Sequence, residues 1–132
     1  MREGVTIGRL AKAAGVNVET IRYYQRRGLL AEPHKPPGGH RRYPGVVMEQ
    51  IAFIRRAQQL GFSLAEVKSL MELSGGSNLK ATRVIAEKKY ANLDLHIAQL
   101  TKMRRRLKSL IDKSRKAVKG PCPIIEALSA DA

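Results

Sequence analysis

The feature that most constrains the fold is a stretch of 37 residues, 80 to 116, that contains no glycine and no proline. Charged and apolar residues alternate along it, which is typical of one long helix. At 1.5 Å per residue this helix is roughly 55 Å long. It is therefore too long to pack within a small domain of its own chain.

Apolar residues recur along this helix at alternating four- and three-residue spacing, as in the a/d seam of a coiled coil. Arg104 interrupts the seam, but Met103 and Leu110 widen the apolar stripe beside it. Because the stripe has no partner in its own chain, we expect a second copy and hence a symmetric homodimer. The alternative is that the helix folds back on the first part of the chain. The expected dimerisation residues are Tyr90, Leu93, Ile97, Leu100, Leu107 and Ile111.

The charge of the chain indicates a polyanionic partner. Lys and Arg number 25 against 11 Asp and Glu, which gives a formal net charge of +14. Nucleic acid and an anionic membrane surface are the two candidates. No run of about 18 apolar residues and no signal-peptide pattern is present, so we expect no membrane partner and a cytoplasmic location.

The first 30 residues have the pattern of two short helices joined by a tight turn. Thr6 is a suitable N-cap for a helix that Gly15 ends. Asn17 is a suitable N-cap for a second helix, with Glu19 in its first turn. This arrangement predicts a helix-turn-helix.

Prolines and glycines follow the second helix and exclude a helix over residues 33 to 39. Gly38-Gly39 indicates the tip of a β-hairpin, which would be an exposed flap. The flap would present the basic side chains of Lys35, His40, Arg41 and Arg42.

A second helix, turn, helix pattern covers residues 44 to 73. Pro44 is a natural first-turn residue for a helix that ends at Gly61. Ser63 and Glu66 then form a capping box for a fourth helix, which ends near Gly75.

The second predicted helix carries the residues that favour nucleic-acid binding. Arg22 and Arg26 are four apart and share a face, with Tyr23 and Arg27 on the adjoining one. A solvated basic face is the plain alternative. The helix-turn-helix and the basic flap favour DNA instead, because Arg binds guanine edges or phosphate and Tyr hydroxyls bind phosphate.

Four segments resemble the MerR family of bacterial transcription regulators. They are TIGRLAKAAGVNVETIRYYQRRGLL, the RRY after the flap, AQQLGFSLAEVKSL, and the late CPII. The first two are most similar to the mercury-responsive members of that family. The resemblance covers almost the whole chain.

The resemblance implies a mainly α fold: a winged helix-turn-helix DNA-binding domain with a small β-hairpin wing, then a long antiparallel coiled-coil dimerisation helix. It implies a homodimer on a pseudo-palindromic promoter element, which distorts the DNA on effector binding so that RNA polymerase can engage. We expect three parts: residues 1–76 as the DNA-binding domain, 77–118 as the dimerisation helix and 119–132 as a tail.

The resemblance also implies roles for particular residues. Thr20, Arg22 and Tyr23 would lie on the recognition helix, and Tyr24 would touch phosphate. Phe62 and Ser63 would form the second wing turn. Further expected contacts, from the first wing, this turn and the residues near it, are Arg41, Arg42, Tyr43, Ser63, Arg55, Arg56 and Lys68.

Cys122 is the only cysteine of the chain. The mercury-responsive members bind the metal with three cysteines, and the other two are absent here. A single thiolate without a nearby histidine binds a thiophilic metal ion weakly. Three readings remain: a buried apolar residue, a redox or alkylation sensor, or an unusual metal site at Cys122.

The family resemblance assigns no role to a basic cluster on the long helix. It comprises Lys102, Arg104, Arg105, Arg106 and Lys108, and we expect it to contact an anionic partner such as flanking DNA or an acidic effector.

No nucleophile with a neighbouring base and no Gly-rich phosphate loop is present, so we expect no enzyme. A non-specific architectural DNA-binding protein and an interaction module that does not read DNA are the competing classes.

Overall fold

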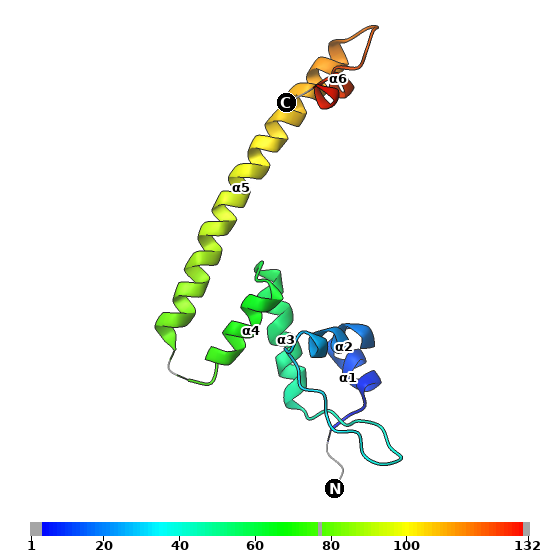
Figure 1. Cartoon of the computed structure of the whole chain (residues 1–132), viewed down its shortest axis with the longest axis vertical. Coiled ribbons are helices and arrows are strands. Elements are labelled where there is room, and N and C mark those ends of the chain that lie inside the picture. The colour runs from blue at the N-terminus through cyan, green and yellow to red at the C-terminus, as the bar shows by residue number, and fades with distance from the viewer. Residues whose placement is uncertain (1–3, 77, 131–132) are drawn as a thin grey trace. The chain divides into compact units, whose positions relative to one another are not determined.

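The computed structural model describes residues 4–76 and 78–130, and this part of the chain is mainly helical (Figure 1). The helices are α1 (Ile7–Ala14), α2 (Val18–Arg26), α3 (Val46–Gln59), α4 (Leu64–Leu73), α5 (Leu79–Lys116) and α6 (Pro123–Ser129). The chain divides into two compact units, Met1–Lys89 and Tyr90–Ala132. None of the described helices is long and apolar enough to cross a membrane.

The helix-turn-helix is confirmed, and its ends form for the expected reasons. The Thr6 side chain accepts a hydrogen bond from the Arg9 amide at 3.4 Å at the start of α1. Gly15 ends α1 with a φ of 72°, a left-handed conformation in which glycine has no steric cost. From there the chain enters α2 within three residues.

The hydrophobic core of the first unit lies between α1, α2, α3 and α4. Leu10, Ile21, Ile51, Ile54 and Val67 are fully buried in it. Helix α3 contacts both α1 and α4, so it holds the helix-turn-helix and the second helix pair together. We call residues 4–76, with α1 to α4, the head.

The flap differs from the expected β-hairpin. Residues 31–42, here called the wing loop, contain a turn at residues 37–39 but no strand. The Gly39 amide donates to the Pro36 carbonyl at 3.1 Å, so the turn lies close to where Gly38-Gly39 predicted it. Three prolines remove amide donors from the arms of this loop, which prevents a ladder of paired hydrogen bonds.

The pairing that does form fixes the base of the wing loop. Tyr43 and Val5 make an isolated antiparallel bridge, with N···O distances of 2.8 and 3.0 Å. The segment before α1 is therefore tied to the segment before α3, and the wing loop projects from the head beyond this bridge (Figure 1).

The expected capping box at the start of α4 is confirmed. The Glu66 amide donates to the Ser63 hydroxyl at 3.2 Å, and the Ser63 amide donates to the Glu66 carboxylate at 2.8 Å. Helix α3 lies within the span expected from Pro44 to Gly61.

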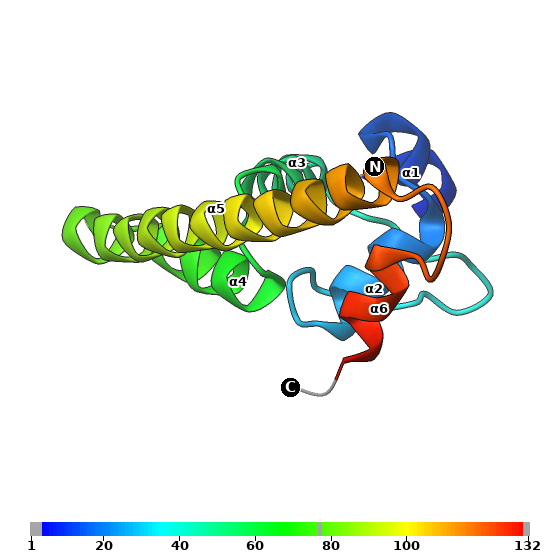
Figure 2. The ribbon, with the colours of Figure 1, turned by 90° about the horizontal axis from the view of Figure 1, so that it is seen from above.

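Helix α5 is continuous over 38 residues, as predicted (Figure 2). None of its side chains is buried within the chain. The seam residues Tyr90, Leu93, Ile97, Leu100 and Leu107 are between 41% and 69% exposed. The short α6 that follows also has no buried residue, although its sequence offers Ile124, Ile125 and Leu128.

Candidate DNA-binding surface

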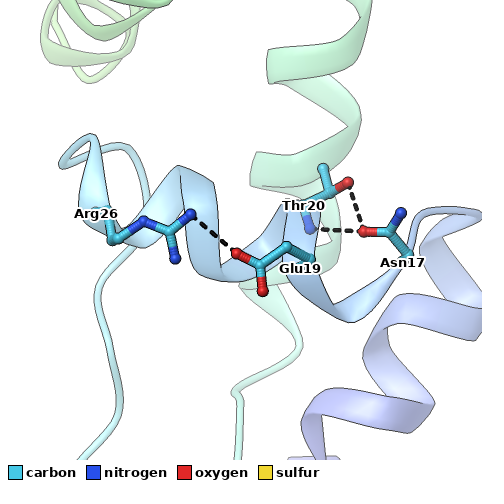
Figure 3. A network of polar contacts seen from close by, with 4 residues as sticks. All are labelled: Asn17, Glu19, Thr20 and Arg26. Atoms are coloured by element: carbon cyan, nitrogen blue, oxygen red, sulfur yellow. Dashed lines mark hydrogen bonds and ion pairs between the residues drawn. The ribbon is translucent and has the colours of Figure 1, made fainter.

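The start of α2 is fixed by a local network around Asn17 (Figure 3). The Asn17 side-chain oxygen accepts two hydrogen bonds, from the Thr20 amide at 2.7 Å and from the Thr20 hydroxyl at 2.8 Å. The hydroxyl of Thr20, an expected DNA contact, is therefore used to hold the cap. This network sets the direction in which α2 leaves the turn.

One exposed face of α2 carries an ion pair along its length. Arg26 donates to the Glu19 carboxylate at 2.9 Å across two turns of helix, and the two side chains point toward one another in Figure 3. Because both side chains are well exposed, the pair adds little stability. The pair holds the Arg26 guanidinium next to Glu19 on this face of α2.

Tyr23 lies between two arginines. The guanidinium carbons of Arg26 and Arg27 are 5.7 and 5.8 Å from the centroid of its ring. Arg27 also donates to the Tyr23 hydroxyl at 3.1 Å. The Tyr23 side chain is 40% exposed, so this trio presents two cations and a hydroxyl to solvent.

Arg22 faces a groove between α2, the start of α1 and the wing loop. The groove has a volume of about 440 Å³, and its lining includes the basic residues Lys35, His40 and Arg41 besides Arg22. Glu32 is the acidic residue of the lining. The groove is therefore positively charged, as a site for phosphate or a base edge requires.

Arg41 stabilises the wing loop from within. Its Nε donates to the Pro33 carbonyl at 3.0 Å, and its guanidinium lies 3.4 Å from the Glu32 carboxylate. These two contacts replace some of the hydrogen bonds that a β-hairpin would supply. Arg41 and Arg42 are both half-buried, so part of each side chain remains accessible.

Two of the expected contact residues, Tyr24 and Tyr43, lie in the core, at 5% and 2% exposure. The Tyr24 hydroxyl donates to the Gln58 side-chain oxygen at 2.9 Å, and Gln25 donates to the Tyr43 hydroxyl at 2.6 Å. Burial raises the pKa of Tyr24, although the nearby charge of Arg55 opposes the shift. Both rings therefore support the head from inside rather than join its exposed cationic face.

The remaining expected contacts are distributed around α3 and α4. Arg55 donates to the Ala14 carbonyl at 3.1 Å, where a cation stabilises the C-terminal end of α1. Arg56 is exposed, and Ser63 caps α4. Of these three residues, Arg56 is the one whose side chain has no structural role among the described contacts.

Several contacts that shape this surface have no signal in the local sequence. Gln25 and Gln58 hold the two buried tyrosines, and their partners are 18 and 34 residues away. Lys89 of α5 pairs with Glu66 at 2.9 Å and lies over the Phe62 ring at 6.0 Å. Local patterns report neighbours within a few residues, so contacts of this range were missed.

Cys122 is exposed, and its nearest described polar side chain is Ser114, with the sulfur 3.8 Å from the hydroxyl oxygen. The nearby backbone amides of Ile125 and Ile124, followed by Ser114, lower the pKa of the thiol. No group of three or more His, Cys, Asp or Glu side chains placed to hold a metal ion occurs within residues 4–76 and 78–130. The donors of a single chain do not fit a thiophilic metal.

Comparison with protein families decides between the classes left open. The profile described as "MerR HTH family regulatory protein" matches residues 5–74. A second profile, described as "MerR, DNA binding", matches residues 48–110.

The chain belongs to the MerR family. It is a DNA-binding transcriptional regulator of that family, and the first profile covers α1 to α4, including the helix-turn-helix.

Individual relatives match over nearly the whole MerR-family chain. The mercuric resistance operon regulatory protein of Shigella flexneri is 44% identical, over 98% of this chain and 91% of its own. The Bacillus megaterium MerR, solved with mercury(II), is 32% identical, with a TM-score of 0.70 over 96% of this chain and all of its own. The lead(II) complex of PbrR691 from Ralstonia metallidurans is 27% identical, with a TM-score of 0.81 over 95% and 99% of the two chains.

Proposed function

We propose that this MerR-family protein acts as a homodimer on a pseudo-palindromic promoter element and regulates transcription by distorting the DNA, with RNA polymerase on the same promoter as its partner. It is not an enzyme, and it works in the cytoplasm, where the promoter lies. The exposed cationic face of α2, built from Arg22, Tyr23 and Arg26 within a helix-turn-helix, is the observation that carries the proposal.

The residues divide into two groups by what their side chains can reach. We assign direct DNA contact to Arg22, Tyr23 and Arg26 on α2 and phosphate contact to Arg41, Arg42 and Arg56. The other expected residues position this surface: Thr20 holds the cap, Tyr24 and Tyr43 pack beneath it, Arg55 holds the end of α1, and Ser63 caps α4.

The dimer supplies the second copy of this surface. A helix with an exposed apolar seam from Tyr90 to Ile111 is stabilised when a second chain covers it. We accordingly propose residues 1–76 as the DNA-binding domain, 77–118 as the dimerisation helix and 119–132 as the tail. Distorting the duplex over a promoter site costs on the order of a few kcal/mol. Phosphate contacts from two heads can supply this energy.

A footprint on the DNA upstream of the gene, with an affinity comparison against random duplex, tests the proposal. We expect protection of an inverted repeat and about a thousandfold preference for it over random sequence. Arg22→Ala should weaken binding to the repeat by about 1–3 kcal/mol, because a guanidinium that reads a base or phosphate is lost.

Arg83→Ala is the matched control, since it removes the same charge from an exposed position of α5. It should change the affinity less than twofold. Equal affinity for the repeat and for random duplex would instead identify an architectural DNA-binding protein, and an unaffected Arg22→Ala variant would remove α2 from the interface.

A second candidate for the effector is a thiophilic metal ion at Cys122, favoured by the similarity to mercuric resistance regulators and by the lowered pKa of the thiol. Titration of the dimer with mercury(II), read out by transcription from its promoter, tests this candidate. Because one thiolate per chain lacks partner ligands, we expect no response below the concentration at which free thiols bind the ion. A sensitive response that Cys122→Ser abolishes would establish the metal as effector.

A further inference from the structure

The second half of α5 carries a row of cations on one face, which we call the cationic ridge. It consists of Lys102, Arg105, Arg106, Lys113 and Lys116, all exposed. At 3.6 residues per turn these five positions fall within an arc of about 100° and extend over roughly 21 Å of helix. The helix is continuous through this region, so the side chains form one surface.

The charge of the ridge is not compensated within its own segment. Between residues 102 and 119 the chain has nine basic residues and one acidic residue, Asp112. Asp112 lies 3.5 Å from Lys108, which is not part of the ridge. Within residues 4–76 and 78–130, none of the five ridge residues makes an ion pair. Such a density of unpaired cations attracts a polyanion.

The ridge and the dimerisation seam lie on opposite sides of α5. By the same helical spacing, Leu100, Leu107 and Ile111 of the seam fall about 140° or more from the centre of the ridge. A second chain that covers the seam therefore leaves the ridge in solvent. The ridge therefore lies outside the expected dimerisation seam and remains exposed beside it.

We propose that the cationic ridge is a second DNA-binding surface, which holds phosphates of duplex DNA outside the segment bound by α2. Duplex DNA carries one charge per about 1.7 Å, so a 21 Å ridge faces on the order of twelve phosphates. Contacts of this kind carry no sequence information and add affinity alone. This surface goes beyond the proposed function, which rests on the head.

The composition of the ridge favours DNA over an acidic protein. Ser109 is the residue enclosed by the five cations on this face, and it is a hydrogen-bond donor that suits phosphate. Protein interfaces are instead anchored by aromatic and apolar side chains, and the arc from Lys102 to Lys116 has none. The choice of DNA rests on the proposed function: a head that binds DNA tethers the ridge of the same chain to it, which makes duplex the polyanion at the highest local concentration.

The test compares two triple variants of the full-length protein on a random duplex of about 60 bp. The ridge variant is Lys102→Gln with Arg105→Gln and Arg106→Gln. The control is Lys80→Gln with Arg83→Gln and Lys88→Gln, which removes the same charge from exposed positions of the same helix. Dissociation constants are measured between 50 and 200 mM NaCl, and circular dichroism and the mass of the dimer confirm that each variant folds.

Each lost phosphate contact makes the slope of log K against log salt less negative by about 0.9. The ridge variant should lose about two to three units of slope per chain and bind at least about tenfold more weakly at low salt. The control should lose less than about half a unit. The promoter footprint, which depends on α2, should keep its position in the ridge variant, whereas Arg22→Ala should weaken binding to the repeat by about 5- to 150-fold, or about 1–3 kcal/mol.

Equal losses of salt slope and of affinity in the two triple variants would show an effect of net charge. They would overturn the ridge as a DNA-binding site. An unchanged slope in the ridge variant would also overturn the proposal and identify the ridge as a solvated face. If the ridge variant also failed to capture an acidic partner protein, the ridge would be a surface for that protein. These outcomes are distinguishable from failure of the proposed function, which fails if the footprint is absent, if the repeat has no preference over random duplex, or if Arg22→Ala leaves the affinity for the repeat unchanged.

Discussion

At the scale of single residues, Gly4 is a position where the backbone does not accept a side chain. Its φ of 93° is one that side chains with a Cβ rarely adopt, and an added Cβ would overlap the Tyr43 carbonyl oxygen. That carbonyl accepts the bond from Val5 that closes the base of the wing loop. A side chain at residue 4 would therefore strain the backbone and break the bridge.

We expect Gly4→Ala to lower the free energy of unfolding by about 1–3 kcal/mol, measured by urea denaturation. Gly8→Ala is the matched control, because Gly8 lies inside α1 with open space around its Cα. Alanine favours a helix interior, so this control should raise stability by about 0.5–1 kcal/mol. Similar effects of both changes would contradict the role assigned to the bridge.

At the scale of elements, the start of α4 combines a cap with a link to α5. The Ser63 amide, followed by Lys89, lowers the pKa of the Glu66 carboxyl. A carboxyl whose pKa is lower in the folded state stabilises the protein above its unfolded pKa of about 4.3, and this contribution is lost as the pH falls through the folded value.

We therefore predict that Glu66→Gln is less stable than the native protein at pH 7 and that the difference disappears as the pH falls below about 4. The difference in the free energy of unfolding is measured by urea denaturation at a series of pH values. Glu72→Gln is the control, since Glu72 is an exposed carboxylate of the same helix with no described ion pair. A pH-independent difference for Glu66→Gln would mean that the charge is not what stabilises this junction.

The seam of α5 makes a second prediction at this scale. Leu100→Glu places a charge in the seam and should convert the dimer to monomer, as measured by sedimentation. Leu95→Glu is a matched control, because Leu95 is equally an exposed leucine of α5 but lies on the opposite face. Dissociation by both variants, or by neither, would contradict a coiled coil through this seam.

How far the sequence predicted these elements depended on the range of each signal. The caps Thr6, Asn17 and Ser63 act over three residues, and all three were predicted correctly. The wing loop was predicted wrongly as a β-hairpin. The two glycines indicate a turn, but the prolines in the arms of the loop prevent the strand pairing that a hairpin needs. Burial of Tyr24 and Tyr43 depends on partners far along the chain, so the basic pattern of α2 and the RRY motif could not reveal it.

At the scale of the whole molecule, positive charge is spread over both compact units. Residues 1 to 89 carry a net charge of +9 and residues 90 to 132 carry +5. The head accounts for specific recognition through α2, and the cationic ridge adds contacts that depend on salt but not on sequence.

The most direct test of the central claim is the selection of bound duplexes from a random-sequence library by the purified native protein. A dimer that reads DNA through two copies of α2 must enrich an inverted repeat, with two matching half-sites at one fixed spacing. Arg22→Ala should reduce the enrichment while leaving the mass of the dimer unchanged. A selected pool with no common motif, or with a lone half-site, would contradict the account.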